Sequence, residues 1–186
     1  MEQILYIGLS QSFFAGLLIA LRKPKTMANQ VLAAWFFLIC IEMIIVLINS
    51  NFIELYSIKV LPFTYGPLMF LYARMMTSEK PEFHWKYLWH FAPFLVFFIV
   101  SMVFLNKPVM DGTKGFLVND RFISLRIIYS VSFFVSITAY SVATFLIIHR
   151  HQMHLKDYLS YSSSKYTLQW LIGLSVVFYI SYILVF

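Results

Sequence analysis

The stretch FLVFFIVSMVF at residues 94–104 is apolar on every side, and LICIEMIIVLI at residues 38–48 repeats the pattern with a single charged residue, Glu42. A surface helix of a soluble protein keeps one polar face, and a strand of a membrane barrel alternates polar and apolar residues. Neither pattern is present here. Both stretches therefore predict helices that lie among lipid or among other helices.

Six segments of this kind divide the 186 residues, and short charged connectors separate them. A helix needs about 20 mostly apolar residues to cross about 30 Å of hydrocarbon. With 61% hydrophobic residues and a mean hydropathy of +0.78, the chain leaves no room for a soluble catalytic domain. We predict an all-α fold, a polytopic transmembrane helical bundle that forms a single domain over residues 1–186. The expected spans are 3–21, 29–49, 59–76, 87–105, 122–148 and 167–186.

The distribution of Lys and Arg predicts the orientation, because loops on the cytoplasmic side of a membrane are enriched in both. If the first connector is cytoplasmic, the inner side carries nine: Arg22, Lys23, Lys25, Arg74, Lys80, Lys86, Arg150, Lys156 and Lys165. The outer side then carries five: Lys59, Lys107, Lys114, Arg121 and Arg126. We therefore expect an amino terminus outside, and the basic net charge reads as an orientation signal and an attraction to anionic lipid.

The sixth segment runs to Phe186 without a polar or basic residue to end it. With the amino terminus outside, six crossings also return the chain to the outside. We therefore expect a seventh span and a cytoplasmic region beyond Phe186. The alternative is a sixth helix that ends flush with the outer interface.

Motifs for chemistry are absent from the sequence. It contains no HExxH, no G-x-S-x-G, no phosphate-binding glycine loop and no pair of carboxylates within a span, so we expect neither an enzyme nor a cofactor. No Cys or carboxylate completes a metal-ligand set with His149, His151 and His154, which favours an interfacial basic cluster over a metal site. The lone Cys40 reads as a small buried hydrophobe.

Glu42 is the polar residue most clearly out of place, because isoleucines, methionine and cysteine surround it within the second span. A carboxylate at that depth costs about 2.5 to 3.5 kcal/mol and requires a partner or a proton. Arg126 lies in the same outer half of the membrane and is the natural partner. Together they would form the polar floor of an outward-facing cavity. Alternatively, Arg126 extends to the headgroups and Glu42 is protonated.

The third span contains the sequence LPFTYGPL at residues 61–68, with Pro62, Gly66 and Pro67 close together. Prolines inside a helix free backbone carbonyls and bend it, which membrane proteins tolerate where neighbours or a cavity satisfy those groups. These three residues are therefore candidates for a hinge, with Tyr65 and Tyr72 lining a cavity beside it. A packing kink without a ligand role explains the same residues equally well.

In the first span, Gly8, Ser12 and Gly16 recur every four residues. Small residues at this spacing let two membrane helices approach closely. Scattered small residues on a helix that faces lipid would give the same pattern, and the sequence alone does not separate the two readings.

Several local motifs together resemble a known family. They are YGPL at 65–68 with Tyr72, Trp85 and Lys86 in the following connector, HFAPF at 90–94, YLS at 158–160 and TLQWL at 167–171. This set is similar to the multi-span amino-terminal region of bacterial membrane-bound AraC-type helix-turn-helix transcriptional regulators. The resemblance covers essentially the whole chain.

The resemblance implies a sensor domain of about seven helices in the bacterial cytoplasmic membrane, which detects an unknown small-molecule or membrane-derived signal. It also implies a cytoplasmic DNA-binding domain, through which alone DNA would be contacted and which this chain lacks, and a homodimer as one assembly. Candidate ligand contacts are Glu42, Tyr65, Tyr72, Asp120, Arg121 and Arg126.

Two other classes of function stay open. A small transporter or permease would place its substrate site at helix breaks near the middle of the membrane, usually in repeated halves. The fourth span contains a single proline, Pro93, and therefore does not repeat the Pro-Gly-Pro break of the third span. A structural subunit of a larger membrane complex is the other alternative.

Overall fold

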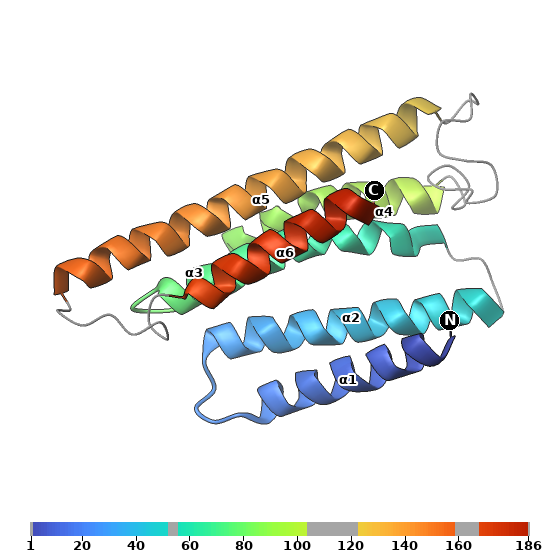
Figure 1. Ribbon diagram of the computed structural model, residues 1–186. Coiled ribbons are helices and arrows are strands. Elements are labelled where there is room, and N and C mark those ends of the chain that lie inside the picture. Colours follow the sequence, from blue (N-terminus) through green and yellow to red (C-terminus); the bar gives the residue numbers. More distant parts are fainter. Residues whose placement is uncertain (1, 52–55, 104–122, 159–167, 186) are drawn as a thin grey trace.

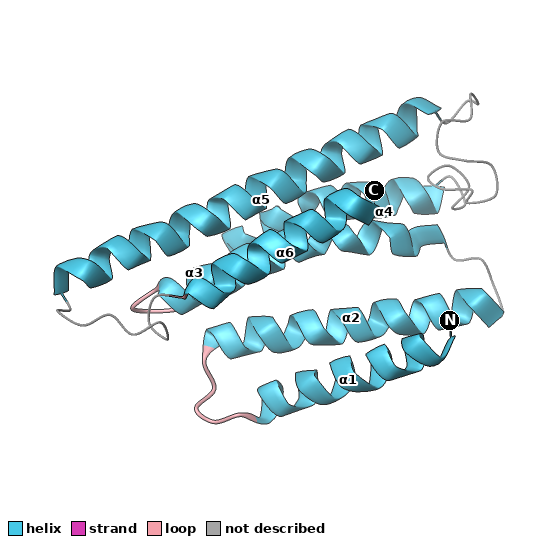
Figure 2. Cartoon of the chain, in the orientation of Figure 1, coloured by secondary structure: helices cyan, strands magenta, loops and turns pink. Residues whose placement is uncertain are grey.

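The fold is built entirely of helices in the residues that the structure, a computed structural model, describes: 2–51, 56–103, 123–158 and 168–185. These residues contain no strand (Figure 2), so the all-α prediction is confirmed. The elements, with 3₁₀ helices written η, are α1 (Glu2–Leu21), α2 (Met27–Asn51), η1 (Tyr56–Thr64), α3 (Tyr65–Thr77), η2 (Trp85–Phe91), α4 (Ala92–Val103), α5 (Ile123–Tyr158) and α6 (Gln169–Val185).

The helices alternate in direction, and each of the six expected segments contains a helix (Figure 1). The α1 and α2 helices form a hairpin along one side of the bundle. The α3 helix packs against both α2 and α5, while α4 packs on η1 and α6 packs on α5. One end of the bundle holds the end of α1, the start of α2, the end of α3, the start of η2 and the end of α5. We call it the basic end, since Arg22, Lys23, Lys25, Arg74, Lys80, Lys86 and Arg150 lie there.

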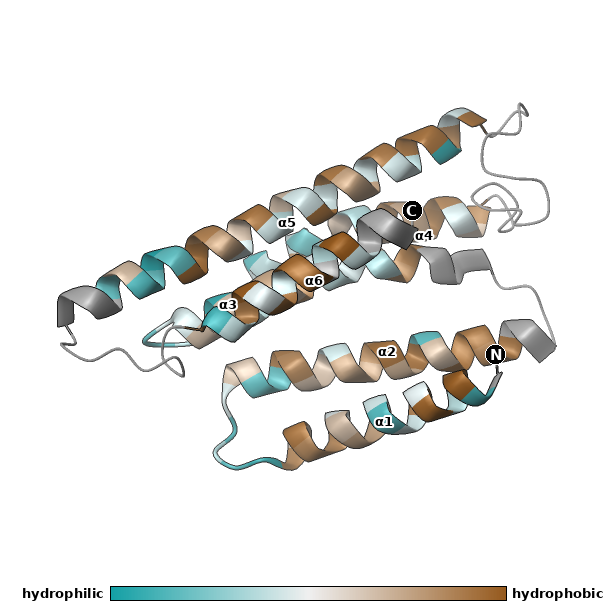
Figure 3. Ribbon diagram, in the orientation of Figure 1, coloured by the Kyte–Doolittle hydropathy of each residue, from teal (hydrophilic) through white to brown (hydrophobic). Residues whose placement is uncertain are grey.

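Within the described ranges, four helical segments are long and apolar enough to cross a membrane: Gln3–Leu21, Met27–Ile48, Trp85–Val103 and Ile123–His154. Brown, hydrophobic segments recur along the length of these helices in Figure 3, and their apolar residues are not confined to the interior. Large hydrophobic side chains such as Val135 and Val177 are exposed. Exposed apolar surface on this scale marks an interaction with lipid or protein. The fold therefore supports a membrane protein.

The third expected span is divided in the structure, whereas the sequence predicted one bent helix over 59–76. Residues Tyr56–Thr64 form η1 with Pro62 inside it, and Tyr65–Thr77 form α3. Pro67 lies in the first turn of α3, where a backbone N–H has no partner within the helix in any case. The prolines therefore mark a junction between two kinds of helix instead of kinking a continuous one.

The α5 helix is longer than the expected fifth span, which ended at residue 148. It continues to Tyr158 and has 36 residues, about 54 Å at 1.5 Å per residue. This exceeds the hydrocarbon thickness of about 30 Å. No proline or glycine interrupts the sequence of α5, so the helix continues after the apolar run has ended. His149, Arg150 and His154 therefore lie on a helix and not in a connector.

The small residues of α1 face α2. The Ser12 side chain is 6% exposed, and its Oγ lies 3.2 Å from the Sγ of Cys40. A Cβ added at Gly16 would lie 3.2 Å from Cε1 of Phe37. The stripe is therefore the packing face of the hairpin, and the reading of scattered lipid-facing residues is wrong. Cys40 is buried and free, in agreement with the prediction.

The core of the bundle is built around η1 and α3. Ten of the 13 residues of α3 are buried. One cluster joins η1, α4 and α5: Val60, Phe63, Phe97, Tyr129, Phe133 and Ile137. A second joins α2, α3, α5 and α6: Ala28, Tyr72, Ala73, Met75, Ile148, Leu168 and Leu171. The short helix α3 therefore lies at the centre of the bundle, in contact with α2, α5, η1 and η2.

Candidate functional site

The junction between η1 and α3 lies directly against α5. A Cβ added at Gly66 would lie 3.0 Å from Cδ2 of Tyr140 and 3.2 Å from its Cβ. Real Cβ atoms essentially never come closer than the first of these distances, so the lack of a side chain at Gly66 is what lets the two helices meet. Gly66 is therefore explained by close packing as well as by its position beside Pro67.

The Tyr140 side chain also reaches η2. Its hydroxyl oxygen lies 3.0 Å from Nδ1 of His90 and donates to the carbonyl oxygen of His90 at 3.3 Å. Since the hydroxyl has one proton, both bonds form together when Nδ1–H of His90 donates to the hydroxyl. The Phe70 ring packs on both partners, at 5.2 Å from the ring of His90 and 5.9 Å from that of Tyr140.

The contacts continue from His90 to the end of α3. The rings of His90 and Tyr87 stack at 6.5 Å, and Cζ of Arg74 lies 5.1 Å from the centroid of the Tyr87 ring. Such cation–π contacts contribute about 0.5 to 1 kcal/mol at exposed sites. We call this series of contacting residues the Tyr140 relay: Gly66, Tyr140, His90, Tyr87 and Arg74. It joins the junction at the start of α3 to the basic end.

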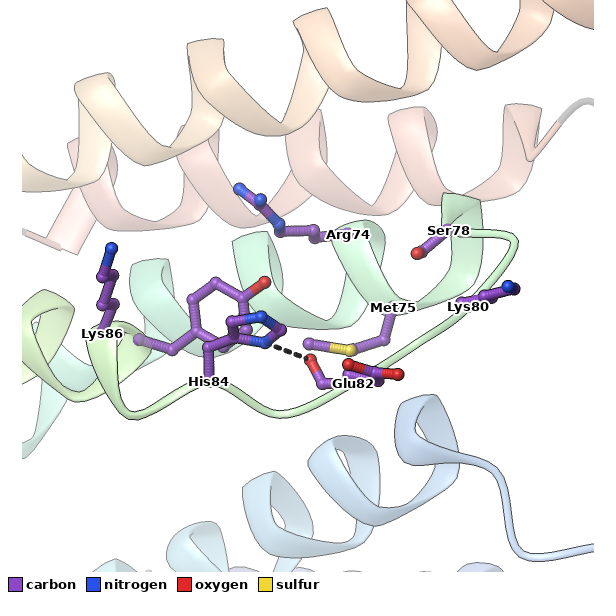
Figure 4. Close-up of a pocket in the computed structure, with 8 residues that line it drawn as sticks. Arg74, Met75, Ser78, Lys80, Glu82, His84 and Lys86 are labelled. Atoms are coloured by element: carbon purple, nitrogen blue, oxygen red, sulfur yellow. Dashed lines mark hydrogen bonds between the residues drawn. The ribbon is translucent and has the colours of Figure 1, made fainter.

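A pocket of about 310 Å³ lies at the basic end, between the last turn of α3 and the connector to η2 (Figure 4). We call it the basic pocket. Its lining residues are Arg74, Met75, Ser78, Lys80, Glu82, His84, Lys86 and Tyr87. Three permanent cations and a histidine therefore oppose a single carboxylate. The Nδ1 of His84 lies 3.3 Å from the carbonyl oxygen of Glu82, and this contact holds together the connector that forms one wall of the pocket.

Two of the predicted ligand contacts are core residues. Tyr65 is buried, with its ring 6.3 Å from that of Trp35. Tyr72 is buried in the cluster that α6 completes, with its ring 6.3 Å from that of Trp170. Neither tyrosine lines the basic pocket. Their contribution in this structure is to packing.

The predicted pair of Glu42 and Arg126 stays a prediction. Glu42 is half-buried on α2, whose main helical neighbours are α1 and α3. Arg126 is 4% exposed on α5, whose main helical neighbours are α3 and α6. A guanidinium that extended to the headgroups would be exposed, so the burial of Arg126 favours a position inside the bundle. Asp120 and Arg121 lie outside the described residues.

The predicted hinge residues Pro62, Gly66 and Pro67 mark the junction between η1 and α3. The Tyr140 relay begins at this junction, because Tyr140 packs on Gly66. Sequence reasoning missed Tyr140, which gives no signal within an apolar helix rich in aromatic residues. It also missed the basic pocket. The signal for the pocket was the density of ionisable residues at 74–86.

Two hydroxyls beside Tyr140 lack hydrogen-bond partners in the described part of the chain. They are Oγ of Ser141 and Oγ1 of Thr144, both buried, and Thr144 has no exposed surface. An unpaired buried hydroxyl costs about 1 to 3 kcal/mol. In the described ranges, no three His, Cys, Asp or Glu side chains gather around a common point.

No known protein family, curated protein or solved structure matches the chain. The class therefore follows from the geometry alone. The described residues form an all-α protein with four helices long and apolar enough to span a membrane, a buried junction at its centre and a basic pocket at one end.

Proposed function

We propose that the chain is the membrane-embedded sensor domain of a bacterial one-component transcriptional regulator. It passes a signal to a cytoplasmic helix-turn-helix DNA-binding domain that is not part of this chain. The observation that carries the proposal is the Tyr140 side chain, which packs on the junction at Gly66 and hydrogen-bonds to η2 through His90. A change of packing at the junction must therefore act on η2 and on the basic end.

The orientation follows from the charges. The basic end faces the cytoplasm of a bacterial inner membrane and the amino terminus lies outside, because Lys and Arg gather on the cytoplasmic side of membrane proteins. The part of α5 beyond residue 148 then projects from the membrane on the cytoplasmic side, since the helix is longer than the bilayer is thick. It offers a rigid contact for an output domain.

The signal is a shift between two packings of the bundle. A ligand or membrane component acts in the outer half, where Glu42, Asp120, Arg121 and Arg126 supply polar contacts. The unpaired hydroxyls of Ser141 and Thr144 support a second packing, in which they would gain the acceptors that they lack in this one. One interhelical hydrogen bond of about 0.6 kcal/mol biases such an equilibrium about threefold.

The coding sequence downstream of Phe186 tests the proposal. A sensor domain requires an open frame that adds a seventh span, which brings the chain to the cytoplasm, and then a helix-turn-helix domain. A stop codon directly after Phe186 contradicts it and favours the transporter or the complex subunit.

Within such a full-length regulator, alanine at Glu42 and Arg126 tests the polar floor. We expect altered signalling, because removal of either partner leaves a polar group in the membrane interior. Unchanged signalling and unchanged stability would contradict this part of the proposal.

A further inference from the structure

The basic pocket is lined by more positive than negative charge, with Arg74, Lys80 and Lys86 against Glu82. Arg74 and Lys86 both project toward the top of the view in Figure 4, while the carboxylate of Glu82 lies on the lower side. The Arg74 guanidinium is held over the Tyr87 ring, so it loses less freedom when it binds. A guanidinium and an ammonium on one side of a pocket match the oxygens of a phosphate group.

The surface beside the pocket is that of a membrane interface. Trp85 and Trp89 are 81% and 79% exposed on η2, and Leu88 between them is exposed as well. Tryptophan is enriched at the level of the lipid headgroups, where its ring is partly in the apolar layer and its N–H is in the polar one. Lys86 follows Trp85 directly. The pocket therefore lies at the depth where lipid phosphates lie.

We propose that the basic pocket binds the phosphate of an anionic phospholipid headgroup, with Arg74 and Lys86 as the main contacts. Basic pockets beside membrane helices bind anionic headgroups in this way. The exposed tryptophans favour a lipid over a soluble phosphate, because the acyl chains of a lipid held there run along the apolar surface of η2 and α4. The pocket volume of about 310 Å³ is sufficient for a headgroup but not for a large soluble ligand.

The lipid also connects the pocket to the relay. Arg74 is the last residue of the Tyr140 relay and the first cation of the pocket, so an occupied pocket fixes the end of α3. The binding proposal needs only that the chain lies in a membrane. It does not rest on the sensor function, and each can fail without the other.

Native mass spectrometry of the full chain in detergent tests the site, with phosphatidylglycerol and phosphatidylcholine of identical acyl chains as probes. We expect retention of phosphatidylglycerol and a higher unfolding temperature in its presence. R74Q/K86Q should bind it about thirtyfold more weakly, since both cations that contact the phosphate are lost. The charge-retaining R74K/K86R should keep most of the affinity.

The matched control is K23Q/K25Q, which removes the same charge from exposed positions at the same end but outside the pocket. It should bind like the unmodified chain. Equal losses in both glutamine variants would show diffuse attraction and overturn the proposal. Circular dichroism establishes that each variant is folded. Displacement of phosphatidylglycerol from the unmodified chain by inorganic phosphate would overturn the choice of a lipid, whatever the variants do.

Discussion

The hairpin of α1 and α2 and the group of helices around α3 are both made from largely apolar sequence but have different roles. The α1 helix contacts α2 through its small residues and presents side chains such as Phe14 to the outside. In α3 ten of 13 residues are buried, and its neighbours include α2 and α5. Hydropathy predicts that a segment enters a membrane, but it does not predict whether lipid or protein surrounds it there.

The largest difference in the free energy of unfolding should come from replacing one phenylalanine in the helices around α3 and one in the hairpin. Phe133 on α5 is 1% exposed within the cluster around Phe63, whereas Phe14 on α1 is 60% exposed. We expect Phe133→Ala to lower the free energy of unfolding by about 3 to 5 kcal/mol, through lost contacts and a cavity. Phe14→Ala should change it by less than about 0.5 kcal/mol. Unfolding in nanodiscs measures both, and equal losses would contradict the assignment of the core.

Glycine replacement sharpens the comparison at the junction. Gly66→Ala places a Cβ 3.0 Å from Tyr140 and should destabilise the bundle by about 1 to 3 kcal/mol through overpacking. Gly173→Ala on α6 is the control, because a Cβ there meets no atom within 4 Å. It should be neutral or slightly stabilising. A neutral Gly66→Ala would show that α3 and α5 are less closely packed than described.

Loss of the Tyr140 hydroxyl should have a smaller effect on stability. Tyr140→Phe removes both bonds to His90 and should cost about 1 kcal/mol. Tyr179→Phe is the matched control, since it removes a bond of 3.2 Å to the exposed Thr138 between α6 and α5. We expect less than half the loss there. If the two variants unfold alike, the bond to His90 has no special place in the bundle.

The smallest effect should come from the hairpin interface. Ser12→Ala removes a contact to the thiol of Cys40, which is a weak partner, and should cost about 0.5 kcal/mol. Ser10→Ala is the control, because the Ser10 hydroxyl bonds only within its own helix at Ile7 and is exposed. The loss from Ser12→Ala should appear as faster hydrogen exchange in α1 and α2 alone. Faster exchange throughout the bundle would contradict the separation of the two regions.

Most of the helices could be predicted from the sequence because they lie in long apolar runs, and a bilayer accepts such a run only as a helix. The boundaries that differed have local reasons. Hydropathy falls at His149, but no proline or glycine follows up to Tyr158, so the helix outlasts the apolar run. In the third span, proline placement predicted a disturbance at 62–67 but not that the chain would change from a 3₁₀ to an α-helix there.

The candidate site was less predictable, because it depends on contacts between distant residues. Tyr140 and His90 are 50 positions apart, and a tyrosine among many aromatic residues carries no pattern of its own. Tyr65 and Tyr72 stood out through their position beside the prolines, yet both serve the core. The stripe of Gly8, Ser12 and Gly16 was readable because a repeated small residue has a direct physical consequence for helix packing.

Hydrogen exchange of the chain in nanodiscs tests most directly whether Tyr140 joins the junction to the basic end. In Tyr140→Phe, amides of Trp85–Phe91 and of the last turn of α3 should exchange faster than in the unmodified chain, while those of α1 should not change. The Tyr179→Phe control should leave η2 unaffected. Unchanged exchange in η2 of Tyr140→Phe, or the same increase in the control, would contradict the relay on which the account depends.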